Sequence, residues 1–257
     1  MKKQTMIPLF SGIALFVLGI AAVVMSRGAA LAEEASASSK LLFALSLILT
    51  LIGLLVAVVS VLPKRQSTDV RTLALAALFA ALCYIGFTYC KIDIPVGSEK
   101  TAFHLGNVFC VLAALFLGGM WGGMAGAVGM TLADLTTAYV TSAPKTFLLK
   151  LCIGLITGLV AHQVFHLSQE RERKVSVPVA TVLSCTAGMA FNVVADPVVG
   201  YFYKMYIMGI PQDAAKIWAK MGAVTTSVNA VVAVVCATVF YLALRPALKK
   251  AKLMPAI

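Results

Sequence analysis

Eight apolar runs, most of them about twenty residues long, constrain the fold of this chain more than any other feature of its sequence. They cover residues 7–25, 41–62, 71–90, 104–118, 121–140, 145–166, 177–205 and 214–244. About twenty apolar residues in an α-helix cross the ~30 Å hydrocarbon core of a bilayer. Because a backbone in lipid must satisfy its own hydrogen bonds, we expect every run to be a helix and the chain to contain no sheet. The sequence therefore predicts an all-α integral membrane protein.

The composition excludes a water-soluble globular domain. Only 12% of the residues are charged and 61% are hydrophobic, whereas soluble domains carry about 25% charged residues. The formal net charge is +11, but the cations are strung along the connectors between the runs. A nucleic-acid surface would need them gathered on one folded face, so we expect no nucleic-acid partner.

The distribution of positive charge predicts the orientation in the membrane. The densest basic segments, KRQSTDVR (64–71) and QERERK (169–174), fall on the same side when the runs alternate in direction. The positive-inside rule makes that side cytoplasmic. We therefore expect a multi-pass protein of the cell membrane with both termini inside.

The N-terminus also has features of a secretory signal. MKK, an apolar run and GAALAEEASA (28–37) are arranged as in a cleavable leader. The run of residues 7–25 is longer than the roughly 7–15 residues of such leaders, so we expect an uncleaved helix. Cleavage would place the new N-terminus outside and leave the rest of the topology unchanged.

The glycine-rich stretch LGGMWGGMAGAVGM (117–130) predicts close helix packing. The chain has no phosphate-binding loop of the G-x-x-x-x-G-K-[ST] type and no G-x-G-x-x-G,. Small residues spaced four apart form a groove in which a neighbouring backbone can approach closely. We expect this packing role for Gly118, Gly122, Gly126 and Gly129. Gly118 and Gly119 would also allow a tight turn between two antiparallel spans.

Polar residues gather at the two ends of the glycine-rich stretch. IDIPVGSEKTAFHLGN (92–107) precedes it and TLADLTTAYVTSAPKTFLLK (131–150) follows it, both on the predicted outer side. Charged residues inside a span are costly and mark functional sites. We expect Asp134 and Lys150 to be partners, near His104 and Asn107. The alternatives are that Lys150 reaches the interface with its long side chain and that Asp134 caps a helix end.

The last two spans add further polar candidates. Asn192 and Asp196 are one turn apart and share a helix face, and Pro197 perturbs the helix beside them. Asn229 follows Thr226 by three residues. These side chains would line a polar cavity or form plain hydrogen bonds between helices.

These motifs resemble a known family. FHLGN, an apolar run, a G-x-x-x-G-x-x-x-G helix ending in LADL and then AP-K-T-x-L-x-K are similar to the substrate-binding S component of energy-coupling factor (ECF) vitamin transporters, over residues 69–252. The resemblance implies a six-helix bundle that binds a small vitamin-like molecule near the outer surface. It also implies a transmembrane scaffold subunit and two ATPase subunits, which fits a chain without an ATP-binding motif. Residues 69–257 would form this domain, and residues 1–68 would be a two-helix membrane extension without a counterpart in the family.

The expected site follows from the motifs and the resemblance together. We expect the substrate to be bound by Pro95, His104, Asn107, Asp134, Tyr139, Lys150, Asn192, Asp196 and Asn229. The family contacts its scaffold through an A-x-x-x-A face, which Ala76, Ala77, Ala80 and Ala81 satisfy in LALAALFAALC. Hydroxymethylpyrimidine, pantothenate, a vitamin B6 form and riboflavin all remain open as ligands.

The sequence also bears on two other classes of protein. An intramembrane metalloenzyme would need a metal site, and AHQVFH (161–166) spaces two histidines four apart but lacks the glutamate of H-E-x-x-H,. All six cysteines lie within spans and form no C-x-x-C pair,. We therefore expect no catalytic residue, metal or cofactor. A self-sufficient secondary carrier or a structural membrane protein is the alternative, although we find no inverted repeat typical of carriers.

Overall fold

The computed structural model describes residues 69–97, 99–169 and 174–251 continuously, together with scattered helical positions between residues 11 and 53. The predicted membrane extension over residues 1–68, with its spans at 7–25 and 41–62, lies outside the continuously described part.

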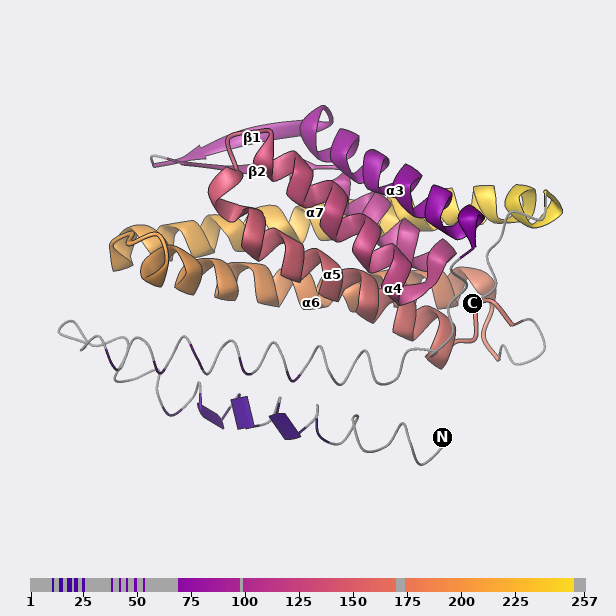
Figure 1. Cartoon of the computed structure of the whole chain (residues 1–257), viewed down its shortest axis with the longest axis horizontal. Helices are drawn as coiled ribbons and strands as arrows, with labels where there is room; N and C mark the ends of the chain where they lie inside the picture. The colour runs from indigo at the N-terminus through magenta and orange to yellow at the C-terminus, as the bar shows by residue number, and fades with distance from the viewer. Residues whose placement is uncertain are drawn as a thin grey trace. The chain divides into compact units, whose positions relative to one another are not determined.

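Five helices of the described chain are long and apolar enough to cross a membrane. Figure 1 shows them side by side with their axes roughly aligned. They are α3 (Val70–Thr88), α4 (Gly106–Leu135), α5 (Ala143–Leu159), α6 (Val177–Tyr206) and α7 (Gln212–Lys250). A 3₁₀ turn, η1 (Val140–Ser142), precedes α5, and a π-helical turn, η2 (Val160–Val164), extends it. The prediction of an all-α membrane protein is confirmed for its helical spans.

The helix α4 is two antiparallel rods joined at Gly118. This glycine has φ 80° and ψ 173°, a backbone conformation that favours glycine over residues with a side chain. A Cβ added to Gly122 would meet Ala114, and one added to Gly126 would meet Cys110. The glycine farther along the chain faces a residue that lies earlier in the chain. The second half of α4 therefore folds back along the first half. With α4 counted as two, the described bundle has the six predicted spans.

A two-stranded hairpin contradicts the prediction that the chain contains no sheet. Strands β1 (Lys91–Val96) and β2 (Glu99–His104) pair antiparallel, with Lys91 opposite His104 and Val96 opposite Glu99. The expectation of helix alone holds only for backbone in contact with lipid. The hairpin belongs to a connector between two spans, where the strands satisfy each other's hydrogen bonds. In Figure 1 it extends from the C-terminal end of α3.

Glycines bring α4 and α5 into backbone contact, in a region that we call the glycine seam. A Cβ at Gly154 would meet the backbone of Gly123, and one at Gly158 would meet the backbone of Gly119. Gly129 lies in the same way against the carbonyl oxygen of Ala80 on α3. Such close approach between helices is the usual means of packing in lipid, where burial of apolar surface gives no driving force.

Candidate functional site

A cavity of about 130 Å³ lies among β2, α4, α5, α6 and α7. Its wall includes eight of the nine residues predicted to bind substrate, so residues distant in the sequence converge on one place. These eight are His104, Asn107, Asp134, Tyr139, Lys150, Asn192, Asp196 and Asn229.

The ninth predicted residue, Pro95, lies away from the cavity. It is exposed on β1, opposite Lys100 of β2. The hydrogen bonds to α7 are made by β2, and β1 is one strand farther from it, about 4.8 Å. Lys100 therefore lines the cavity and Pro95 does not.

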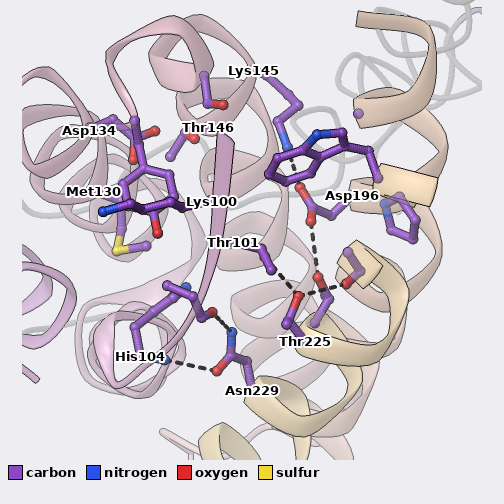
Figure 2. Close-up of a pocket in the computed structure, with 18 of the residues that line it drawn as sticks. Lys100, Thr101, His104, Met130, Asp134, Lys145, Thr146, Asp196, Thr225 and Asn229 are labelled. Atoms are coloured by element: carbon purple, nitrogen blue, oxygen red, sulfur yellow. Dashed lines mark hydrogen bonds and ion pairs between the residues drawn. The ribbon is translucent and has the colours of Figure 1, made fainter. Parts of the chain in front are cut away.

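Side chains of α7 hold β2 in place over the cavity. The Asn229 amide nitrogen donates to the carbonyl oxygen of Ala102, and its amide oxygen accepts from the backbone N–H of His104, both at 3.0 Å. The hydroxyls of Thr101 and Thr225 are also 3.0 Å apart. Figure 2 shows these interactions side by side. Because both ends of the Asn229 amide bind backbone, this side chain positions the hairpin.

An ion pair ties α5, α6 and α7 together at the wall of the cavity. The ammonium of Lys145 is 2.6 Å from one carboxylate oxygen of Asp196. The other carboxylate oxygen accepts a hydrogen bond of 3.0 Å from the hydroxyl of Thr226. Figure 2 shows this chain of contacts from Lys145 through Asp196.

The predicted pairing of Asp134 with Lys150 is wrong. Within the described chain neither side chain has an ion-pair partner, and the cavity's salt bridge joins Lys145 to Asp196 instead. Thr146, one turn before Lys150 on α5, is the neighbour of Asp134. In this register of α5 against α4, the Lys150 ammonium and the Asp134 carboxylate do not form an ion pair.

Several polar atoms in the cavity wall are buried without a hydrogen-bond partner among the described residues. They are Nδ1 of His104, Oδ1 of Asn107, Oδ2 of Asp134 and Oδ1 of Asn192. Lys150 is 7% exposed, and no hydrogen bond from its ammonium occurs within the described residues. Buried polar groups in proteins are nearly always paired, and each unpaired one costs about 1–3 kcal/mol. A bound molecule with complementary groups would remove this cost.

The imidazole of His104, the last residue of β2, is in its neutral form. Burial, followed by the charge of Lys150, lowers the pKa of His104 to about 3. Its ring packs edge-on against Phe87, with centroids 4.7 Å apart. A neutral imidazole has one donor and one acceptor nitrogen, so Nδ1 is available for a hydrogen bond of either kind.

Tyr139 connects the turn after α4 to β1. Its hydroxyl donates to Asp93 at 2.9 Å, and the ammonium of Lys91 lies 4.8 Å from its ring centroid. Lys91 also pairs with Asp93 at 3.3 Å. The hydroxyl of Tyr139 is thus used within the protein, and its ring is the part that lines the cavity.

Some cavity residues were missed in the sequence. Lys145 stands in the AP-K-T-x-L-x-K motif but is not among the residues predicted to bind substrate. Trp218 and Lys204 were not singled out, and they form a cation–π pair with the ammonium 3.9 Å from the ring centroid. An aromatic residue near the start of the last span was the available signal for Trp218.

The four alanines predicted to contact a scaffold divide between two faces of α3. Ala76 is buried, and Ala80 is half-buried with its carbonyl oxygen against Gly129. Ala77 and Ala81 are exposed. Only the second pair lies on a surface open to another protein.

His162 is held by neighbours at the opposite end of α5. Its ring nitrogens lie within hydrogen-bond distance of the Ser168 hydroxyl and the Ala114 carbonyl oxygen. In the described residues no three metal-ligating side chains are grouped.

Comparison with known proteins gives one match. A family model described as "ECF-type riboflavin transporter, S component" matches residues 67–246. No curated protein and no solved structure matches the chain. The matched segment contains α3 to α6, nearly all of α7 and every residue that lines the cavity.

Proposed function

The chain belongs to the family of ECF-type riboflavin transporter S components, and from this we propose that it captures a small water-soluble vitamin or vitamin precursor at the outer face of the membrane. In this proposal a transmembrane scaffold and two ATPases of an ECF module drive uptake. The coarser statement, a substrate-binding subunit of a membrane transporter, follows from the family itself.

The observation that carries the proposal is the set of buried polar atoms without partners in one cavity. Asn107, Asp134 and Asn192 come from two different helices and line the same cavity, and each has a buried oxygen without a hydrogen-bond partner among the described residues. A structural network would pair such atoms with one another. Their arrangement supports a site completed by a bound small molecule, with Asn229 and the Lys145–Asp196 pair as its supports.

The proposed direction of transport rests on orientation. The cavity lies at the hairpin end of the bundle, which the positive-inside rule assigns to the outside. In the sequence, the basic segment QERERK follows η2, beyond the opposite end of α5. Labelling of single cysteines placed in each connector tests this orientation, and a QERERK segment labelled from outside would contradict it.

The partners are proposed from the family and from the surface of α3. Ala77 and Ala81 form an exposed small-residue pair where a second transmembrane helix can approach closely,. Replacing both with leucine should block assembly with a scaffold while the isolated chain still folds. Co-purification of tagged chain, scaffold and ATPases measures this effect.

Transport assays separate this function from that of a secondary carrier. The chain alone should bind its substrate without ATP, because the bundle itself forms the site. Uptake into vesicles should require the module and ATP. Uptake at full rate by vesicles that contain only this chain would favour the carrier and refute the proposal.

A further inference from the structure

We propose that the molecule bound in this cavity is a small organic acid whose carboxylate or phosphate group pairs with Lys150. The inference rests on the proposed binding function and narrows it to a class of ligand. It is drawn from the charges and the polar side chains that line the cavity.

The charges that line the cavity do not balance. The wall holds four lysines and two aspartates, an excess of two positive charges, and these are Lys100, Lys145, Lys150, Lys204, Asp134 and Asp196. Lys145 is paired with Asp196, and Lys204 contacts the Trp218 ring. Lys100 is exposed at the rim. Lys150 is the buried cation left without an anion among the described residues.

The position of Lys150 makes it the binding point for an anion. It lies seven residues into α5, about 10 Å along the helix, and is 7% exposed. A buried charge without a partner is costly, and removing it from water is offset only by a close counter-ion with good geometry. An anionic ligand supplies that counter-ion.

Other polar side chains of the wall serve the rest of the ligand. Asn107, Asp134 and Asn192 line the same cavity. An asparagine amide both donates and accepts, and an aspartate carboxylate accepts. The bound molecule is therefore an acid that carries further hydrogen-bonding groups.

The vitamin named in the family's description does not match the charge of this wall. Riboflavin carries no anionic group that could pair with Lys150. Phe87, Tyr139 and Trp218 contribute aromatic surface beside the lysines. The excess of positive charge thus points to a ligand different from riboflavin.

The first experiment needs no knowledge of the ligand. The full chain is purified in detergent, and its thermal unfolding is measured with three probes: the anion-exchange-retained fraction of a small-molecule cell extract, the unretained fraction, and riboflavin. We expect stabilisation by the retained fraction alone. The acid inference is overturned if the unretained fraction or riboflavin stabilises the protein, either alone or to the same extent as the retained fraction. That result would leave the proposed binding function supported. No stabilisation by any probe refutes the binding function itself.

Phosphatase treatment of the retained fraction identifies the anionic group. Loss of the stabilising effect assigns a phosphate, and its persistence assigns a carboxylate. An effect that appears only in the unretained fraction after treatment would show that the neutral product binds, and would overturn the role of the anion.

The second experiment tests Lys150 directly. Lys150→Met should require at least tenfold more of the retained fraction for the same stabilisation, and Lys150→Arg should restore most of the effect because it keeps the charge. Lys216→Met is the matched control, since Lys216 is exposed, pairs with Asp213 and lies outside the cavity wall. A Lys150→Met variant that responds like the control overturns the proposal. If Lys150→Met does not fold, Lys150→Arg is compared with the wild type in both extract fractions. A Lys150→Arg protein stabilised by the retained fraction alone supports the proposal, and one stabilised equally by both fractions overturns it.

Discussion

The glycine seam and the cavity follow opposite packing rules within the same bundle. At the seam, α4 and α5 touch through backbone, and an added methyl group at Gly122 or Gly154 has no space. At the cavity, polar atoms such as Oδ2 of Asp134 are buried without partners. The second half of α4 belongs to both, because it carries Gly122 in the seam and Asp134 in the cavity wall. The difference separates what stabilises the bundle from what it presents to a ligand.

This contrast makes stability and binding separable by mutation. Changes at the seam should act first on the free energy of unfolding and reach the cavity only through displaced helices. Changes at the cavity should alter binding or pH dependence with smaller effects on folding. The predictions below test that separation, beginning with the largest expected effect.

The largest effect is expected from Gly122→Ala. The new Cβ would collide with the backbone of Ala114, which cannot move aside as a side chain could. Overpacking of this kind costs about 1–3 kcal/mol and sometimes more, and we expect about 3 kcal/mol here. Denaturant titration in detergent measures the loss. The displaced half of α4 carries Asp134, so stabilisation by the retained extract fraction should fall as well.

Gly126→Ala is the graded comparison for this change. Its new Cβ would meet the Cys110 side chain, so we expect a smaller loss of stability than for Gly122→Ala. Equal and negligible losses in the two variants would mean that the seam is not tightly packed.

A smaller loss is expected from Lys145→Met. This change leaves the partly buried Asp196 carboxylate with the Thr226 hydroxyl as its remaining hydrogen-bond partner among the described residues. Breaking a buried ion pair costs about 3–5 kcal/mol, and partial exposure reduces our expectation to about 2 kcal/mol. The double variant Lys145→Met/Asp196→Asn should recover part of the loss. Strictly additive losses in denaturant titrations would show that the two side chains do not interact.

The pH dependence of stability tests the buried state of His104. The pKa of His104 is about 3 in the folded protein and about 6.5 in an unfolded chain. Between these values only the unfolded chain binds the proton, so stability is full above pH 6.5 and falls as the pH drops toward 3. At pH 5.5 the loss should be about 1.4 kcal/mol relative to pH 7.5.

His104→Gln should abolish the part of the stability loss at acidic pH that comes from His104. The measurement compares the free energy of unfolding at pH 7.5 and 5.5 for both proteins. An identical acid loss in wild type and variant would show that His104 titrates normally and is accessible to solvent.

The spans could be predicted because lipid allows few solutions. The run predicted over residues 177–205 is α6 at Val177–Tyr206, and the turn at Gly118 requires a residue that tolerates positive φ. The hairpin was missed because the rule that excludes sheet applies only within the hydrocarbon. The alternation of polar and apolar residues in KIDIPV (91–96) is a strand signal that the sequence does contain.

The members of the site were predictable, but their pairing was not. Polar residues in apolar spans are few, so most of those that were singled out meet at one cavity. Which lysine meets which aspartate depends on the register between helices. One turn of α5 decides that Thr146 rather than Lys150 lies beside Asp134, and the sequence contains no direct signal for that register.

The smallest expected effect is a gain in stability. It comes from a glycine-to-alanine substitution at the cavity, Gly222→Ala. A Cβ added to Gly222 meets nothing within 4 Å, and Gly222 lies inside α7. Alanine in a helix interior is favoured over glycine by about 0.8–1.0 kcal/mol, so Gly222→Ala should stabilise the bundle by roughly that amount. Gly222 also lines the cavity, and its new methyl group would occupy space meant for the ligand. The variant should therefore unfold at higher denaturant concentration yet need severalfold more of the retained extract fraction for the same further stabilisation. A Gly222→Ala protein that loses stability as Gly122→Ala does would show that the cavity is packed like the seam and that the comparison between the two regions fails.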